Sequence, residues 1–552
     1  MGVGYVLDAH VLGTSSALRS VVICFYLSNE GIRLHGIRIV ILALNWIKYW
    51  LAPELTIDFG ANIVYNMVSA GIMHAGRVED MLIGREKEQR VLAEAFQADE
   101  SRFVAVYGRR RVGKTYLIRE SMNSRFTFQH TGYYGGKLID ELFEFCASLR
   151  EYGLKDFATP RNWLEAFELL KELIRRSTEK RKVIFLDELS WMDTHGSDFI
   201  MALEGFWNGW ASARTDILLI VCGSVTSWML NKIIHNKGGL YNRLSYRIHL
   251  QPFSLKECES YIQSRNIVMN RHQILECYMI MGGIPFYWSF LEKGFSLPQN
   301  IDRIFFAKDA PLEHEFDYLY AALFKKPEPY VKIISALAKK KTGMTREELL
   351  KATHLADSGN LSIRLEELES CGFLRKYRQY GMKERNAVYQ LIDNFTLFYY
   401  KFLEEKSTDE HYWSNQINMP AVNAWCGLAF ERVCLEHVSQ MKQALGISGV
   451  LSEECSWACK EDKENGIYGS QIDLMIVRKD QVINLCEMKF SGKKYTITAK
   501  VDEDIRRKTS DFLSVTGARY AIHTTLVTPY GIADGSYAGN IQNVITTDDL
   551  FS

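Results

Sequence analysis

The sequence lacks the cysteine patterns that build disulfide frameworks or structural zinc sites. Its 11 cysteines are scattered along 552 residues, and no two of them form a CxxC pair. The closest two, Cys455 and Cys459, have no histidine or cysteine partner at zinc-site spacing. We therefore expect reduced thiols in a cytoplasmic protein and no disulfide framework.

The chain also lacks an excess of either charge, since 66 basic residues balance 66 acidic ones. No global basic field attracts nucleic acid or an anionic membrane, so any nucleic-acid contact has to come from local patches. Hydrophobic residues make up 47% of the sequence. Length and composition predict about three or four domains, each with its own core.

Long apolar runs are missing as well. Two shorter runs, 21–27 and 39–51, fall within residues 1–80, and Asn45 and Lys48 interrupt the second run. Neither reaches the roughly 18 to 20 apolar residues of a membrane span, and no secretory cleavage pattern precedes them. We interpret residues 1–80 as a dispensable extension or a misread start, with Met73 or Met81 as the alternative start. A helical appendage and a membrane-associated segment are the other two interpretations.

From residue 82 onward, short apolar strands alternate with amphipathic helices. This alternation predicts an α/β fold with a parallel sheet and helical crossovers. A helical block follows from about residue 255 to residue 292. The expected strands are 103–107, 126–130, 183–186, 217–221 and 247–250, and the expected helices include 116–121, 138–152 and 163–174.

A glycine-rich segment stands between the first strand and the first of these helices. It runs Gly108-Arg-Arg-Arg-Val-Gly113-Lys114-Thr115 and matches the GxxxxGK[ST] pattern in the strand–loop–helix context of a P-loop. The two glycines let backbone N–H groups curl around phosphates. We expect Lys114 to reach the terminal phosphates and Thr115 to offer its hydroxyl to Mg²⁺. The segment therefore predicts ATP binding with Mg²⁺ as cofactor.

Two acidic residues end the third strand. Asp187 and Glu188 follow the apolar run 183–186, at the carboxyl end of a buried strand, where open α/β sheets bind ligands. We expect Asp187 to complete the Mg²⁺ coordination shell and Glu188 to orient the attacking water. The alternative is a solvated acidic turn.

Further polar residues flank the last two strands of the sheet. Ser224 follows the fourth strand and is a candidate sensor of the γ-phosphate, with a helix N-cap as the alternative role. Arg243 and Arg247 flank the start of the fifth strand. An arginine at the γ-phosphate, from the same chain or a neighbouring subunit, would stabilise transition-state charge. We favour Arg243 over a surface salt bridge, and action from a neighbour would require a homo-oligomer.

Residues 330–392 have a different pattern. Helices expected at 330–340, 345–352 and 361–370 precede a strand, a turn at Gly381 and a second strand at 387–392, which is typical of a winged helix. The third helix has three glutamates against Arg364 and suits phosphates poorly, although winged helices often place this helix in the major groove. The wing is more basic, with Arg375, Lys376, Arg378, Lys383 and Arg385. Both DNA binding and a structural lever stay open, and we favour the lever.

The order of four elements resembles a known family. Leu82-Ile-Gly-Arg85-Glu, the arginine-rich P-loop, the Leu-Asp-Glu motif and Gly282-Gly-Ile-Pro285 are similar to the archaeal-type ATPase family, a STAND-like branch of the AAA+ superfamily. The resemblance extends from residue 82 to the end of the chain. It implies that Arg85 and Pro285 contact the base side of the nucleotide.

The C-terminal segment has acidic residues on two successive strands. If these strands form a hairpin centred on Asp480, Asp473 lies opposite Glu487 and Lys489 shares their face. Opposed carboxylates repel each other, and a divalent cation between them would remove that penalty. Lys489 would then polarise a water or stabilise phosphoryl oxygens, which is the layout of a PD-(D/E)xK nuclease. The alternative is a solvated ion pair on a degenerate domain.

The resembled family commonly has such a nuclease-like tail. This likeness implies that Glu431, on the helix before the strands, is the further carboxylate found in that fold. The predicted metal ligands of the tail are therefore Glu431, Asp473 and Glu487.

The sequence thus predicts a P-loop parallel sheet with a helical lid, a winged helix and an α/β restriction-endonuclease-like domain. We expect an ATP-driven switch that controls metal-dependent cleavage of nucleic acid in the cytoplasm, with ATP and DNA or other nucleic acid as partners and no membrane. The alternative is an ATP-gated signalling or DNA-binding module whose tail does not cut. The expected boundaries are 1–80 (extension), 81–252 (ATPase core), 253–325 (lid), 326–405 (winged helix and bridging helix), 406–419 (linker) and 420–552 (tail).

Overall fold

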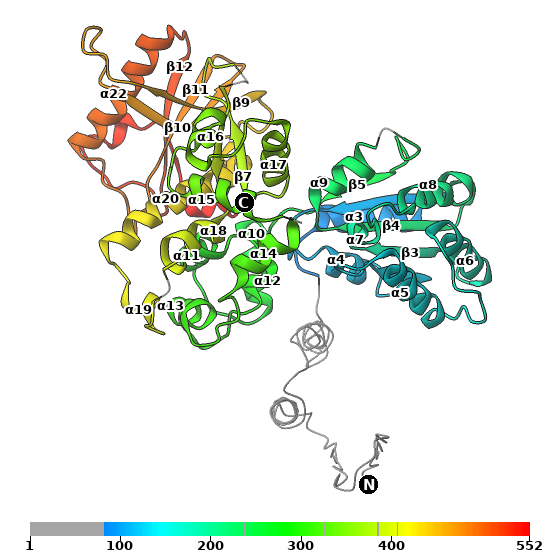
Figure 1. Cartoon of the computed structure of the whole chain (residues 1–552). Helices are drawn as coiled ribbons and strands as arrows, with labels where there is room; N and C mark the ends of the chain where they lie inside the picture. The colour runs from blue at the N-terminus through cyan, green and yellow to red at the C-terminus, as the bar shows by residue number, and fades with distance from the viewer. Residues whose placement is uncertain (1–81, 237, 325, 384–385, 406) are drawn as a thin grey trace, which may run out of the picture. The chain divides into compact units, whose positions relative to one another are not determined.

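The five strands expected after residue 82 form one parallel sheet. The computed structural model describes residues 82–236, 238–324, 326–383, 386–405 and 407–552. The strand order is β2-β3-β4-β1-β5, and every neighbouring pair is parallel (Figure 1), which confirms the expected α/β core. The strands are β1 (Arg102–Tyr107), β2 (Phe128–Thr131), β3 (Lys182–Asp187), β4 (Ile217–Gly223) and β5 (Tyr246–His249).

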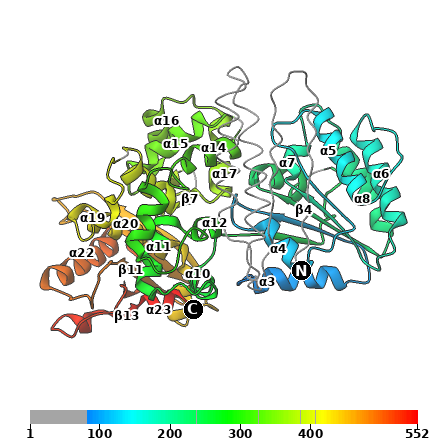
Figure 2. The same cartoon turned by 90° about the horizontal axis from the view of Figure 1, so that it is seen from below.

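Helices cover both faces of this sheet (Figures 1 and 2). One face packs Phe103, Ile184 and Leu219 against α5 (Leu138–Glu151), α6 (Trp163–Arg176) and α8 (Phe199–Gly209). The other face packs Val104 and Ile220 against α3 (Glu86–Gln97) and α4 (Lys114–Ser121). Because both faces are buried, the strands are continuous apolar runs, as parallel sheets require. Shorter helical segments are α7 (Leu189–Met192), Ala211–Ala213, α9 (Thr226–Trp228) and a π-helical turn, Met229–Ile234.

A group of helices follows β5. Three of them start with capping boxes at Ser254, Asn270 and Ser296. In each box the side chain of the capping residue accepts from a backbone N–H three residues later, and the side chain of that later residue accepts from the backbone N–H of the capping residue. These caps explain why the helical pattern begins where the apolar periodicity does. The helices are α10 (Leu255–Ser264), α11 (Arg271–Met281), α12 (Pro285–Trp288), α13 (Leu297–Ile301), a π-helical turn (Asp302–Phe306) and α14 (Glu315–Leu323).

The three helices and two strands expected at 330–392 all form. A short additional strand, β6 (Met344–Thr345), pairs with β8, so the antiparallel order is β6-β8-β7. The chain then continues through α18 (Asn394–Phe398) and a π-helical turn (Tyr399–Leu403). The helices are α15 (Glu328–Ala338), α16 (Arg346–Thr353) and α17 (Gly359–Ser370), and the longer strands are β7 (Leu374–Tyr377) and β8 (Val388–Leu391).

A turn within the segment expected to be a polar linker, 406–419, packs against the helices. It contains α19 (Tyr412–Asn415), in which Trp413 is buried. The backbone N–H groups of Trp413 and Ser414 donate to the carboxylate of Asp302 at 2.7 and 3.1 Å. The polar residues around Trp413 concealed this docked turn in the sequence.

The C-terminal segment is a mixed sheet in the order β13-β12-β11-β10-β9, between helices. Strands β9, β10 and β11 are antiparallel, whereas β11, β12 and β13 run parallel. Phe512 of α22 packs on one face, and Phe430 of α20 belongs to the core on the other. The elements are α20 (Pro420–Glu436), α21 (Val438–Ala444), β9 (Ser452–Cys459), β10 (Ser470–Arg478), β11 (Val482–Met488), α22 (Ala499–Thr516), β12 (Ala521–Val527), a short turn of helix (Ala538–Asn540), β13 (Asn543–Ile545) and α23 (Thr547–Leu550).

One strand of this arrangement was not expected from the sequence. Strand β9, which precedes the expected hairpin of the tail, was not among the expected strands, because it is half polar and lacks clear alternation. The interpretations of residues 1–80 lie outside the described residues. Within the described residues, no helix combines the length and the apolar character that crossing a membrane requires. Residues 82–552 group as one compact unit, so the domain boundaries within it stay predictions.

Candidate functional site

The two glycines of the phosphate loop are required for different reasons. Gly108 has a φ of 144°, and a Cβ added there would lie 2.3 Å from the carbonyl oxygen of Leu250. Gly113 has a φ of 89° and open space around the position of a Cβ. The first glycine therefore allows the loop to pass close to the end of β5. The second provides the left-handed backbone at the start of α4, on the side where a phosphate would enter.

The structure brings the predicted phosphate and metal residues together. Lys114 is buried, and its Nζ donates to the carbonyl oxygens of Gly108 at 3.0 Å and Arg109 at 2.9 Å. Thr115 Oγ1 donates to Asp187 Oδ2 at 2.7 Å. A hydroxyl beside a carboxylate at a helix N-terminus is the oxygen donor set that Mg²⁺ accepts, so these residues fit the ion.

Glu188 lies directly before α7 in a left-handed backbone conformation, with a φ of 47°. Its Oε2 accepts hydrogen bonds from the backbone N–H and the hydroxyl of Ser224, at 3.1 and 2.7 Å. Burial raises the pKa of Glu188, and the positive charge of Lys114 opposes that rise. Ser224 does not cap a helix, because α9 begins at Thr226 with Val225 before it, so the N-cap alternative is wrong.

Arg243 lies near the amino-terminal ends of the strands, whereas the phosphate loop lies at their carboxyl-terminal ends. The N–H of Ser245 donates to the carbonyl of Phe103, whereas the loop leaves β1 after Tyr107. Four residues of strand separate these levels, about 13 Å at roughly 3.3 Å per residue. This position favours action of the exposed Arg243 on a neighbouring subunit, and both forms of the prediction stay predictions. Arg247 pairs in register with Ala105, midway along β1.

The two motifs assigned to the base side of the nucleotide both meet Phe253. Arg85 is buried with its guanidinium 4.6 Å above the Phe253 ring and 3.6 Å from the carboxylate of Glu257. A Cβ added to Gly283 would lie 1.9 Å from the Phe253 carbonyl, so only glycine fits there. Pro285 starts α12 directly afterwards. These contacts join the helical group to the sheet, and contact with a base stays a prediction.

Residues 82–289 match the family model described as an ATPase domain predominantly from Archaea. This part of the chain is an archaeal-type ATPase domain. An uncharacterized protein of Methanocaldococcus jannaschii is 23% identical over 441 residues, which span 78% of this chain and 92% of that protein.

Two solved structures are also similar to the chain. The Walker-type ATPase of Pyrococcus abyssi has a TM-score of 0.40 at 18% identity, covering 58% of this chain and 96% of that one. The ORC2 protein of Aeropyrum pernix with ADPNP and ADP has a TM-score of 0.35 at 13% identity, covering 65% of this chain and 98% of that one. Both TM-scores are below one half, so the assignment of the ATPase domain depends on the family match and the strand order.

The phosphate loop of the ATPase domain also has contacts that sequence analysis missed. Arg109 is buried, pairs with Asp393 at the start of α18 and lies 4.7 Å above the ring of Phe373. Arg111 pairs with Glu315 of α14. The run of three arginines in the loop was visible in the sequence, but acidic partners more than two hundred residues away were not.

In the tail, Glu487 is buried between two lysines. Lys489 Nζ lies 2.7 Å from Glu487 Oε1, and Lys508 Nζ of α22 lies 2.8 Å from Oε2. Burial alone would raise the pKa of Glu487, but the two amines hold it below its usual value. Sequence analysis predicted Lys489 and missed Lys508, which comes from a helix that follows the hairpin.

The predicted register of the hairpin is correct over four residue pairs, from Val477 opposite Ile483 to Leu474 opposite Cys486. Asp473 is the next residue, but it lies in an irregularity of β10 between Ile472 and Met475. Such bulges redirect side chains. Asp473 accepts a hydrogen bond from Gln471 at 2.6 Å.

Glu431 of α20 is the third predicted ligand. It is 9% exposed; Lys341 Nζ lies 2.8 Å from its Oε1, and its Oε2 has no hydrogen-bond partner. Burial and the charge of Asp473 raise the pKa of Glu431. Across the part of the chain that the structure describes, no three His, Cys, Asp or Glu side chains gather to hold a metal ion. The tail carboxylates, as arranged, therefore do not fit a metal, because lysine amines bind Glu431 and Glu487 and Asp473 lies in the irregularity of β10.

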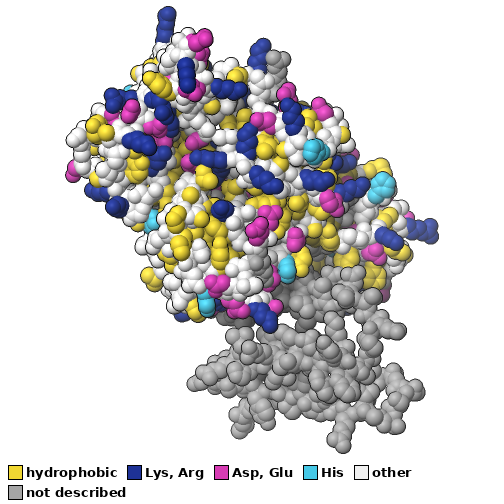
Figure 3. Space-filling view, turned by 60° about the vertical axis from the view of Figure 1, so that its left-hand side comes forward, with side chains coloured by type: hydrophobic (Ala, Val, Ile, Leu, Met, Phe, Trp, Pro, Cys, Tyr) yellow, Lys and Arg dark blue, Asp and Glu magenta, His cyan; other side chains and the backbone are white. Residues whose placement is uncertain are grey.

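Two of the basic residues in the wing after α17 have partners within the chain. Arg375 is half-buried and donates to Gln390 at 2.6 Å, while Arg378 pairs with Glu453 of β9. Burial and the charge of Arg432 lower the pKa of Arg375 to about 10. Figure 3 shows basic side chains interspersed with acidic and apolar ones on the face in view. Among the described basic residues of the wing, Arg375 is therefore partly withdrawn from solvent, whereas Lys376, Arg378 and Lys383 are exposed.

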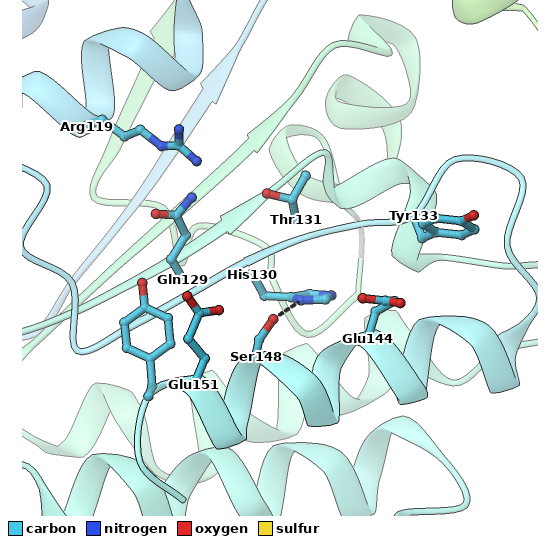
Figure 4. A pocket seen from close by; sticks show the side chains of 9 residues that line it. Arg119, Gln129, His130, Thr131, Tyr133, Glu144, Ser148 and Glu151 are labelled. Atoms are coloured by element: carbon cyan, nitrogen blue, oxygen red, sulfur yellow. Dashed lines mark hydrogen bonds between the residues drawn. The ribbon is translucent and has the colours of Figure 1, made fainter. Parts of the chain in front are cut away.

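A pocket of about 350 Å³ lies beside β2 and α5 (Figure 4). His130 Nδ1 lies 2.9 Å from the hydroxyl of Ser148 there. Burial lowers the pKa of His130 to about 3, so the ring is too weak a base to activate a serine at neutral pH. The pocket therefore does not have the chemistry of a serine hydrolase. Its lining comprises Arg119, Gln129, His130, Thr131, Tyr133, Glu144, Ser148, Glu151 and Tyr152.

Proposed function

We propose that the chain is an ATP-hydrolysing molecular switch whose output comes from the modules that follow the ATPase domain. The observation that carries the proposal is that the phosphate loop, Asp187 and Glu188 meet at the carboxyl ends of the parallel strands. Each comes from the carboxyl end of a strand, which is where open α/β sheets bind ligands.

The side chains have separate roles in this proposal. Lys114 turns from the loop carbonyls to the terminal phosphates, and Thr115 and Asp187 hold Mg²⁺, which supplies positive charge to the phosphate oxygens when bound. Glu188 orients the attacking water and is itself held by Ser224. Ser224 thus acts on the reaction by positioning Glu188.

Replacing the water-orienting group tests this function. Glu188→Gln should bind ATP with wild-type affinity and hydrolyse it about 10² to 10⁴ times more slowly, because only the water-orienting group changes. Glu179→Gln, at an exposed position, is the matched control and should keep the wild-type rate. A Glu188→Gln protein that hydrolyses ATP at the parental rate would remove the proposed role.

We propose that Arg243 acts on the phosphates of a neighbouring copy, so that the active form is a homo-oligomer. Its exposure supports the proposal, and so does its position at the edge of the sheet away from its own phosphate loop. Within the described residues, its side chain has no ion-pair partner.

We propose that residues 326–405 are a winged helix that works as a structural lever. The order of three helices and a β6-β8-β7 sheet supports this assignment. The lever role is supported by contacts at both ends of the module, with the phosphate loop through Asp393 and with β9 through Arg378.

We propose that residues 420–552 have a restriction-endonuclease-like fold. The support is a mixed sheet whose central hairpin has Asp473, Glu487 and Lys489 at one end. Control of metal-dependent cleavage of DNA or other nucleic acid by the switch stays a prediction, because the tail carboxylates as arranged do not fit a metal. A cytoplasmic location stays a prediction.

One observation favours a second candidate function. Because Glu431 and Glu487 are each paired with lysine, the tail is also suited to binding without cutting, under control of ATP. Incubating the full chain with DNA and RNA oligonucleotides, Mn²⁺ and ATP separates the two functions, because only the first yields cleaved products.

A further inference from the structure

The pocket beside α5 follows one edge of the parallel sheet. Among the described strands, β2 is the last in the order and has a neighbour on one side only, so part of its backbone N–H and C=O groups face away from the sheet. Three consecutive residues of β2, Gln129, His130 and Thr131, line the pocket. Because successive side chains of a strand point to opposite faces, a cavity that all three line reaches the edge of the strand itself.

Side chains of opposite charge lie on the two sides of this edge. Arg119 comes from α4, which packs on one face of the sheet, whereas Glu144 and Glu151 come from α5 on the other face. In Figure 4 the side chain of Gln129 lies between Arg119 and Glu151. Burial and Glu151 raise the pKa of Tyr152, and Arg119 opposes that rise. The guanidinium and the carboxylate are therefore both close to this hydroxyl.

These charges are available to a ligand. Within the part of the chain that the structure describes, Arg119, Glu144 and Glu151 have no ion-pair partner, so Arg119 does not pair with either glutamate across the pocket. The pocket has a volume of about 350 Å³, at the lower end of the roughly 300 to 1,000 Å³ of small-molecule sites. A small ligand between the two walls can therefore pair with charges on both.

The combination of charges narrows the class of ligand. A phosphate-type anion would lie beside two carboxylates, and a metal cation would lie beside a guanidinium, so each would meet repulsion. His130 adds no charge, because burial lowers its pKa to about 3. A molecule with both a carboxylate and an ammonium complements the two walls, since Arg119 donates to the first and the glutamates accept from the second.

We propose that this pocket binds a small zwitterion of the α-amino-acid class and that the bound molecule is an effector of the nucleotide site. The ligand would lie on elements that also hold the phosphate and the metal. Arg119 belongs to α4, the helix that begins with Lys114 and Thr115. At the end of β2, the backbone N–H of Gly132 donates to the carbonyl of Asp187 at 3.0 Å. The effector role rests on the proposed function of the nucleotide site, whereas the binding does not.

Binding to the full chain without nucleotide tests the pocket. The standard L-amino acids are titrated one at a time by isothermal titration calorimetry. Any that binds is compared with its N-acetyl derivative, which lacks the ammonium, and with its amide, which lacks the carboxylate. We expect at least one free amino acid to bind, and both blocked forms to bind at least about tenfold more weakly.

Two variants locate the binding in the pocket. Arg119→Met and Glu151→Gln should each weaken binding of the free amino acid at least about tenfold, because each removes one charge-assisted hydrogen bond. The matched controls, Arg125→Met and Glu179→Gln at exposed positions, should bind as wild type does.

Three results would overturn the proposed site. No standard amino acid binds the folded chain, or binding survives both Arg119→Met and Glu151→Gln. In the third, the blocked forms bind as tightly as the free amino acid, which would mean that the strand edge accepts a peptide backbone regardless of charge. The blocked forms are measured on wild type, so this outcome does not depend on a variant that folds.

The dissociation constant of ATP tests the effector role. It is measured on Glu188→Gln, in which hydrolysis is expected to be slow, with and without the amino acid that binds. We expect a change of about fivefold or more, and ATP should change the affinity for the amino acid by the same factor. An unchanged ATP affinity would overturn the effector role and leave the binding site. No ATP binding in any condition would instead overturn the proposed function, whereas the calorimetry without nucleotide would still decide the site.

Discussion

The nucleotide site and the tail contain the same side-chain types at the ends of strands, but the lysines differ in what they bind. In the ATPase domain, Lys114 donates to loop carbonyls, and the carboxylates of Asp187 and Glu188 accept neutral hydroxyl and N–H donors. In the tail, lysine amines bind Glu431 and Glu487 directly. The carboxylate oxygens of the nucleotide site can therefore accept a cation, whereas lysine amines already neutralise Glu431 and Glu487 in the tail.

The largest expected effect is on ATP hydrolysis and concerns Arg243, which we propose to act on a neighbouring copy. Arg243→Ala should reduce ATP hydrolysis by about 10³-fold or more, because a trans-acting arginine stabilises transition-state charge. Mixing Arg243→Ala with Lys114→Ala protein should restore part of the activity, since one mixed interface then has both groups. Steady-state hydrolysis of the mixtures measures this.

Two results would contradict a role across an interface. Full activity of Arg243→Ala alone would exclude the residue from the reaction and direct attention to Arg247. Loss of activity without any rescue in mixtures would mean that the nucleotide site is complete within one chain, which would sharpen its contrast with the tail.

The sequence predicted what is continuous along the chain. The phosphate loop, the Asp187-Glu188 pair and the register of β10 against β11 are each set by one short segment and its neighbours. The distance of Arg243 from the phosphate loop could also have been predicted. In a parallel sheet, the amino-terminal end of β5 and the carboxyl-terminal end of β1 lie at opposite ends of the strands.

Contacts between distant segments could not be predicted in this way. Lys508 comes from a helix after the hairpin, and Lys341 comes from another module. The bulge at Asp473 adds a local irregularity that strict alternation conceals. The two lysines and the bulge together determine the surroundings of the tail carboxylates. The nucleotide site was therefore predicted more closely than the tail.

A smaller effect concerns acid, which should destabilise the core of the ATPase domain. The folded pKa of His130 is lowered to about 3, so the unfolded chain, with a pKa of about 6.5, binds the proton first. Stability is complete above about pH 6.5 and falls as the pH drops towards 3, by about 2 kcal/mol at pH 5 from this residue. His130→Asn should flatten the loss between pH 7 and pH 5 in denaturant unfolding.

The exposed His411 supplies the control for this prediction, since His411→Asn should keep the wild-type pH dependence. If His130→Asn and wild type lose stability in parallel, burial of this ring does not set the acid response of the ATPase domain.

The melting temperature of the full chain, with Mg²⁺-ATP or with Mn²⁺ alone, tests the contrast between the two sites most directly. A ligand that binds only the folded state stabilises it by about 2.7 kcal/mol at a concentration of a hundred times Kd. We expect Mg²⁺-ATP to raise the melting temperature of wild type and of Glu188→Gln, but not of Lys114→Ala, and we expect Mn²⁺ alone to leave all three unchanged. A rise with Mn²⁺ alone that Asp473→Ala abolishes, or no rise with Mg²⁺-ATP, would contradict the account.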